Sequence, residues 1–154
     1  MSASLSGGCL CGAIRFECRA EPVSAVICHC LDCQKAHSAP YAACALMPPG
    51  TLALLSGEPS RYIVVANSGS VTFREFCGRC GTHLFSGAEA FPQWRSVKIG
   101  ALDDPGSIVP VVHVWTERAV PWARIDDGLP RYARQIDAAE LERLWAERPR
   151  RFHP

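Results

Sequence analysis

Apolar positions along this chain repeat mostly with a period of two residues, which is the period of a β-strand. Ile14, Phe16 and Cys18, for example, alternate with more polar neighbours and predict a half-buried strand. Similar patterns predict further strands at residues 23–27, 41–47, 61–65, 71–76, 82–86, 95–99 and 109–115. Turns that contain glycine or proline separate several of these segments. The predicted fold class is therefore mainly β, built from short strands.

One helix is predicted near the C-terminal end, where the apolar period becomes helical. Asp137 and Glu140 have the spacing of a capping box, in which Asp137 accepts from the first turn and Glu140 reaches back. Ile136 and Leu141 are placed for a hydrophobic staple. A short helical turn is also expected after Cys30. No internal repeat or linker interrupts the chain, so residues 1–154 are predicted to form a single domain, with 131–154 as C-terminal helix and tail.

Most of the nine cysteines are clustered at spacings typical of metal ligands. The three groups are Cys9 and Cys11; Cys28, Cys30 and Cys33; and Cys77 and Cys80. Disulfides are disfavoured because the count is odd, no export signal precedes the groups, and paired cysteines this close make strained bridges. Four plus three ligands fit two zinc ions, one in a closed structural site and one with an open position for chemistry.

The first and last groups together supply four thiolates. Gly78 and Gly81 beside the late pair offer the permissive φ values that a tight metal-binding turn needs. The early pair can complete the site, because residues i and i+2 of an extended segment face the same side. The sequence therefore predicts a structural zinc on Cys9, Cys11, Cys77 and Cys80.

The middle group offers three thiolates within six residues and predicts the open, catalytic zinc site on Cys28, Cys30 and Cys33. His29 is a rival fourth ligand, although it should point away if its two neighbours face the metal. A closed structural site completed by His37 is the other alternative. Cys18 and Cys44 are interpreted as small buried hydrophobic residues, and His113 as a packed strand histidine.

Composition and charge narrow the set of partners. The chain has 154 residues and a formal net charge of +1, without a basic stripe interleaved with aromatic residues, which argues against nucleic-acid binding. No apolar run approaches the roughly 20 residues of a membrane span. Residues 1–8 lack the pattern of a secretory signal. We therefore expect a cytoplasmic protein with no nucleic-acid partner and no membrane partner.

Several ordered motifs resemble the glutathione-dependent formaldehyde-activating enzyme family, which includes centromere protein V. They lie at residues 7–12, 28–35, 76–82, 100–105, 113–115 and 121–122. The region that resembles the zinc domain of this family covers residues 7–130. The resemblance implies a zinc-containing β-tent fold of short antiparallel strands. It also implies a structural zinc on the outer four cysteines and a catalytic zinc on the middle three.

The resemblance further implies a zinc-dependent carbon–sulfur lyase-like activity that adds a thiol, glutathione or similar, to a small aldehyde such as formaldehyde. The alternative is a zinc-stabilised binding module with two structural zinc ions and no catalysis. The chain departs from the family after Cys33, where Ala36-His37-Ser38 stands in place of a Gly-Ser or Gly-Thr step. His37 could line the open zinc position or crowd it.

Overall fold

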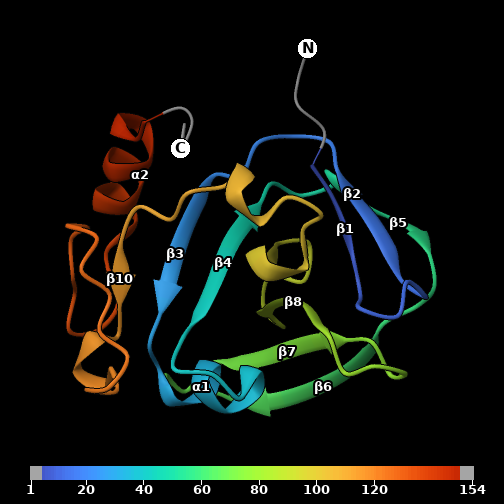
Figure 1. Cartoon of the computed structure of the whole chain (residues 1–154), viewed down its shortest axis with the longest axis horizontal. Coiled ribbons are helices and arrows are strands. Elements are labelled where there is room, and N and C mark those ends of the chain that lie inside the picture. Colours follow the sequence, from blue (N-terminus) through green and yellow to red (C-terminus); the bar gives the residue numbers. More distant parts are fainter. Residues whose placement is uncertain (1–4, 150–154) are drawn as a thin grey trace.

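The computed structural model describes residues 5–149, so the two ends of the predicted domain, 1–4 and 150–154, lie outside the described residues. Figure 1 shows the course of the chain. The strands are β1 (Leu5–Gly8), β2 (Arg15–Cys18), β3 (Ser24–Cys28), β4 (Ala42–Met47), β5 (Leu52–Ser56), β6 (Ser60–Val65), β7 (Val71–Phe76), β8 (His83–Ala88), β9 (Arg95–Lys98) and β10 (His113–Val114). The α-helices are α1 (Leu31–His37) and α2 (Ala138–Glu147), and 3₁₀ helices span Ile99–Ala101, Pro105–Ser107 and Thr116–Arg118.

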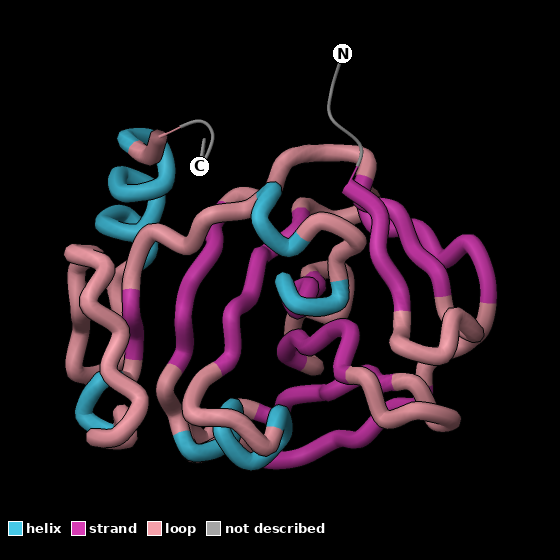
Figure 2. The backbone as a smooth tube through the Cα atoms, viewed as in Figure 1, coloured by secondary structure: helices cyan, strands magenta, loops and turns pink. Residues whose placement is uncertain are grey.

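The strands form two sheets. One has the order β1-β2-β5, and the other has the order β10-β3-β4-β9-β8-β7-β6. Neighbouring strands are antiparallel except β3 and β10, which run parallel. The tube in Figure 2 shows more strand than helix, with α2 at one side of the molecule. The mainly β fold with a C-terminal helix is thus confirmed. Within residues 5–149 no helix is both long enough and apolar enough to cross a membrane.

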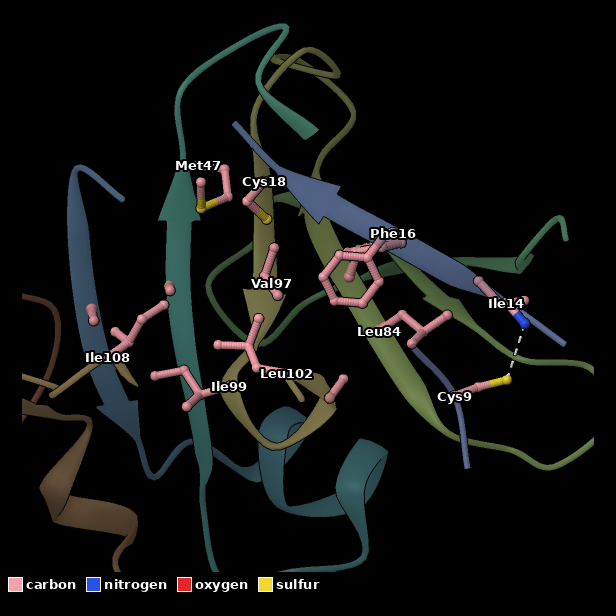
Figure 3. Close-up of a cluster of buried hydrophobic side chains, with 14 of the residues drawn as sticks. Cys9, Ile14, Phe16, Cys18, Met47, Leu84, Val97, Ile99, Leu102 and Ile108 are labelled. Carbon is pink, nitrogen blue, oxygen red and sulfur yellow. Dashed lines mark hydrogen bonds between the residues drawn. The ribbon is translucent and has the colours of Figure 1, made fainter. Parts of the chain in front are cut away.

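The main core lies where the small sheet packs against the large one (Figure 3). Ile14, Phe16 and Cys18 are buried, which confirms the half-buried strand expected from their alternation. The rings of Phe16 and Phe85 meet edge to face with centroids 5.0 Å apart, so β2 is packed directly against β8. The two sheets therefore share one apolar layer, and the opposite face of the large sheet is left to form other contacts.

Two strands were not predicted from the sequence pattern. β1 has the sequence Leu-Ser-Gly-Gly, which has little strand propensity. In β5 the last three residues are all exposed, so buried and exposed positions do not alternate along the strand. Both strands form by pairing with β2. Gly7 is needed in β1 because a Cβ atom there would lie 2.4 Å from the Ala101 carbonyl oxygen. The predicted strand at 109–115 is shorter than expected: β10 covers only His113–Val114, and Trp115 after it has a positive φ of 59°, which is not an extended conformation.

Helix α2 has the predicted cap in part. The Asp137 carboxylate accepts a hydrogen bond from the Glu140 N–H at 2.9 Å. The Glu140 carboxylate does not reach back as expected; it accepts from the Tyr132 hydroxyl at 2.9 Å and from Arg143. Ile136 and Leu141 belong to one apolar cluster, as the staple predicts. The helix is therefore held by the segment before it as well as by its own cap.

Candidate metal centres

The structure brings the outer four cysteines together. The Sγ atoms of Cys9, Cys11, Cys77 and Cys80 all lie within 4.8 Å of one another. Cys9 Sγ is 3.6 Å from Cys11 Sγ, which is 3.8 Å from Cys77 Sγ. A tetrahedron with zinc–sulfur bonds of about 2.3 Å has edges of about 3.8 Å, so the donor set and its spacing fit zinc. This cluster could hold one metal ion.

Backbone and hydroxyl groups surround these sulfurs. The Ile14 N–H donates to Cys9 Sγ at 3.2 Å, a bond drawn in Figure 3. The Thr82 hydroxyl lies 3.2 Å from Cys80 Sγ and also accepts from the Leu10 N–H. The Thr82 hydroxyl and N–H lower the pKa of the Cys80 thiol to about 5. These contacts favour thiolates, the form that binds metal.

The geometry corrects two steps of the sequence reasoning. The Cys9–Cys11 segment is not extended: it forms a turn closed by the Gly12 N–H on the Cys9 carbonyl at 3.0 Å, with Gly12 at φ +76°. Gly81 has the expected positive φ of +76°. Gly78 does not; a Cβ there would lie 2.7 Å from Ser60 Oγ, so Gly78 permits a close approach rather than an unusual φ.

The middle three cysteines also converge. Cys28 ends β3, Cys30 caps α1, and Cys33 lies in the first turn of α1. Their three Sγ atoms lie within 4.8 Å of one another, and the Cys33 N–H donates to Cys30 Sγ at 3.3 Å. Soft thiolate donors suit zinc, so this cluster could hold a second metal ion.

Because the three thiols lie close together, their pKa values differ. Hydrogen bonds from Cys28 and then Cys33 lower the pKa of the Cys30 thiol to about 2, and the interaction with Cys30 raises the pKa of the Cys28 thiol. One sulfur can therefore ionise easily, but further ionisation places like charges side by side. A bound cation would relieve that repulsion.

The two candidate fourth ligands lie outside this sulfur group. The ring of His29 is buried and contacts the ring of His113 through Nε2 and Nδ1 at 2.8 Å. His113 Nε2 in turn lies 2.9 Å from an Asp127 carboxylate oxygen. His113 is thus the packed, hydrogen-bonded histidine that the sequence indicated. His37 Nδ1 bonds to the Cys33 carbonyl at 2.9 Å, and its ring lies beside that of His83.

Cys30 and Cys33 line a cleft of about 580 Å³. Phe91, Trp94 and Trp115 form its aromatic wall. Trp115 has a positive φ of 59°, a conformation uncommon for a bulky residue, at the position just before the 3₁₀ helix Thr116–Arg118. The Gln34 amide donates to the carbonyls of His29 at 2.7 Å and Arg118 at 2.8 Å, which ties α1 to both flanking segments.

Sequence reasoning missed the charged residues of this region. Arg74 lines the cleft from β7, and Lys98 lies beneath it in β9 with only 5% of its surface exposed. Burial and then the charge of Lys98 lower the pKa of His37 to about 4, so His37 is neutral near pH 7. Cys44 is buried as expected, but its sulfur also accepts a bond from Lys98 Nζ at 3.3 Å.

The fold and the two clusters define a mainly β protein whose cysteines can hold metal ions at two places. Residues 4–118 match the model of the glutathione-dependent formaldehyde-activating enzyme, and the protein belongs to this family. It is also similar to a crystal structure of a Rhodobacter sphaeroides protein from structural genomics. That likeness has a TM-score of 0.51 and 19% identity, covering 82% of this chain and 98% of that chain, and supports the fold alone.

Proposed function

We propose that this protein is a zinc-dependent enzyme that adds a thiol, glutathione or a similar one, to a small aldehyde such as formaldehyde. In the reaction the S–H bond of the thiol breaks, and a bond forms between sulfur and the aldehyde carbon. The thiol proton ends on the former carbonyl oxygen. The supporting observation is that the three-thiol cluster borders a cleft large enough for small substrates, while the outer cluster supplies a full set of four thiol ligands.

In this proposal Cys28, Cys30 and Cys33 hold the catalytic zinc, and the outer four cysteines hold a structural one. Zinc with three protein ligands lowers the pKa of a thiol bound at its open position and can polarise a carbonyl oxygen. The chain's own residues position the reactants. Cys30 and Cys33 lie at the cleft surface, beside the aromatic residues that line it.

Buried histidines keep the ligand segment in place. His29 lies between two of the thiols, and its contact with His113 is backed by the Asp127 carboxylate. Since His29 and His113 are each at most 1% exposed, they are held by packing as well as by these bonds. We assign them a positioning role for the Cys28–Cys30 segment rather than contact with substrate.

The test is NMR exchange spectroscopy of adduct formation between glutathione and formaldehyde. The zinc-loaded protein should accelerate exchange above the rate in buffer. Cys30→Ser should return the rate to that of buffer, because one of three thiolates is lost. Cys18→Ser is the matched control, since Cys18 is buried outside both clusters and its variant should keep the activity. Equal rates for the unaltered protein and buffer would contradict the proposal and favour the binding module with two structural zinc ions.

A further inference from the structure

The face of the large sheet that borders the three-thiol cluster carries a cation without an internal partner. Strand register places Leu46, Ser96, Ser86, Arg74 and Tyr62 in one row across β4, β9, β8, β7 and β6. Four of these residues, all but Tyr62, line the cleft that also holds Cys30 and Cys33. Arg74 is therefore set in the cleft by the register of four strands, and the thiol cluster lies at the same cleft.

The other face of β7 shows what a balanced arrangement looks like. Glu75, one residue from Arg74, is 4% exposed and points to the opposite face, where Arg61 and Arg95 donate to its carboxylate at 2.9 Å. Among residues 5–149, in contrast, Arg74 makes no ion pair with a carboxylate. A guanidinium that faces a cleft and has no internal acid is available for an acid brought by a ligand.

Lys98 adds to the positive charge beneath the same surface. It lies two positions along β9 from Ser96, on the same face, and opposite Cys44 of β4. Its Nζ donates to Ser86 Oγ at 2.7 Å and to Cys44 Sγ, but within the described part of the chain it has no carboxylate partner. Buried lysines are rare without a compensating acid. Arg74 and Lys98 therefore both contribute positive charge at the floor of the cleft.

The acidic residue in the cleft does not balance this charge. Asp32 also lines it, and its carboxylate accepts the Asn67 N–H at 2.8 Å. Asp32 lies beyond ion-pair distance of Arg74. Thr72, Ser68 and Ser96 supply further polar groups at the surface. The cleft thus combines an aromatic wall, a few hydroxyl groups, one guanidinium and one carboxylate that is already bonded to a backbone N–H, a lining that fits a small amphipathic acid.

We propose that Arg74, backed by the buried Lys98, forms a carboxylate-binding subsite that makes the cleft select acidic thiols over neutral ones. The inference rests on the proposed function, because it assumes that the ligand's sulfur lies at Cys28, Cys30 and Cys33. Arg74 holds the carboxylate end of the thiol through paired N–H donors, and the sulfur end reaches the thiol cluster. Arg74 is then the residue that determines specificity, and Lys98 strengthens it from below.

The experiment compares two thiols of similar size, 3-mercaptopropionate and 3-mercapto-1-propanol, by NMR titration of the zinc-loaded protein. A charged hydrogen bond is worth enough to favour the acid by about tenfold to a hundredfold. Arg74→Gln should reduce that preference to less than about threefold. Arg74→Lys, which keeps the charge but loses the paired donors, should give an intermediate preference. Arg124→Gln is the matched control, since Arg124 is exposed and lines no part of this cleft.

A third probe, 3-(methylthio)propionate, separates the subsite from the proposed reaction because its sulfur is blocked. It should bind the unaltered protein and the Arg124→Gln variant, but bind Arg74→Gln more weakly. If the two thiols bind equally well, or if Arg74→Gln keeps the full preference, the subsite is refuted and the thiol reaction stands. If the blocked acid binds through Arg74 while neither thiol perturbs the cluster, the subsite stands and the proposed function fails. Binding of none of the three refutes both.

Discussion

The two cysteine clusters should differ in what they contribute to folding. Replacing Cys77 by serine removes one ligand of the outer set, whose members Cys11 and Cys77 are 66 residues apart in sequence. Replacing Cys30 removes a ligand from a set that spans only positions 28–33. We expect Cys77→Ser to lower the stability of the whole protein, and Cys30→Ser mainly to weaken binding of the second metal ion.

The sequence separations set the size of the difference. A cross-link that closes a loop of 66 residues removes about 4 kcal/mol of conformational entropy from the unfolded chain, whereas one that closes five residues removes about 2 kcal/mol. Cys77 is also 2% exposed, so its serine variant buries a hydroxyl group in place of a ligand. For a chain of this length a loss of about 4 kcal/mol lowers the melting temperature by about 10 °C.

The measurements are thermal melts and zinc content for both variants beside the unaltered protein. Cys18→Ser controls for burial of a serine hydroxyl, since Cys18 is fully buried but outside both clusters. Each cluster variant should lose about one zinc ion per chain, and Cys18→Ser should lose none. A melting temperature for Cys30→Ser as low as that of Cys77→Ser would refute the reasoning, because loop length would then not decide the effect.

Two further predictions concern the small sheet and its neighbours. Gly7→Ala should destabilise the protein by about 1–3 kcal/mol in urea denaturation, because its Cβ would clash with the Ala101 carbonyl oxygen; an unchanged midpoint would show that β1 can shift. The Arg15 guanidinium, then the Ser6 hydroxyl, lower the pKa of Asp103 from 3.8 to about 2. This pairing therefore stabilises the fold above pH 4 and is lost as the pH falls toward 2. Asp103→Asn should be less stable than the unaltered protein at pH 7, with the gap closing below pH 4; a gap independent of pH would contradict it.

Local patterns in the sequence were sufficient for much of the fold. The alternation at Ile14, Phe16 and Cys18 predicts β2, and the cap at Asp137 predicts α2, because each depends on neighbouring residues alone. β1 and β5 could not be predicted in this way. Their residues become strands only because β2 offers hydrogen bonds on both of its edges, a long-range condition that no short window contains.

In the candidate site, too, the features that depend on neighbouring residues could be predicted and those that depend on distant residues could not. Spacing within each cysteine group is local, so the sequence indicated which thiols converge within a group, and the ligand count of two plus two indicated that the outer groups join. Arg74 and Lys98 carry no such signal. They reach the cleft through the register of β4, β9, β8 and β7, which the sequence does not specify residue by residue. The same holds for the contact of His29 with His113, residues that are 84 positions apart.

The hydrogen-bonded series from Asp127 through His113 to His29 limits how far this protein can be shortened. The family match ends at residue 118, and every clustered cysteine precedes that point. Asp127 lies beyond it, as does the Pro130 carbonyl that accepts from the His113 N–H at 2.9 Å. A version cut at the end of the match would keep all seven thiols and lose the partners that fix the segment between two of them. The segment needed for these hydrogen bonds therefore extends further along the chain than the segment that matches the family.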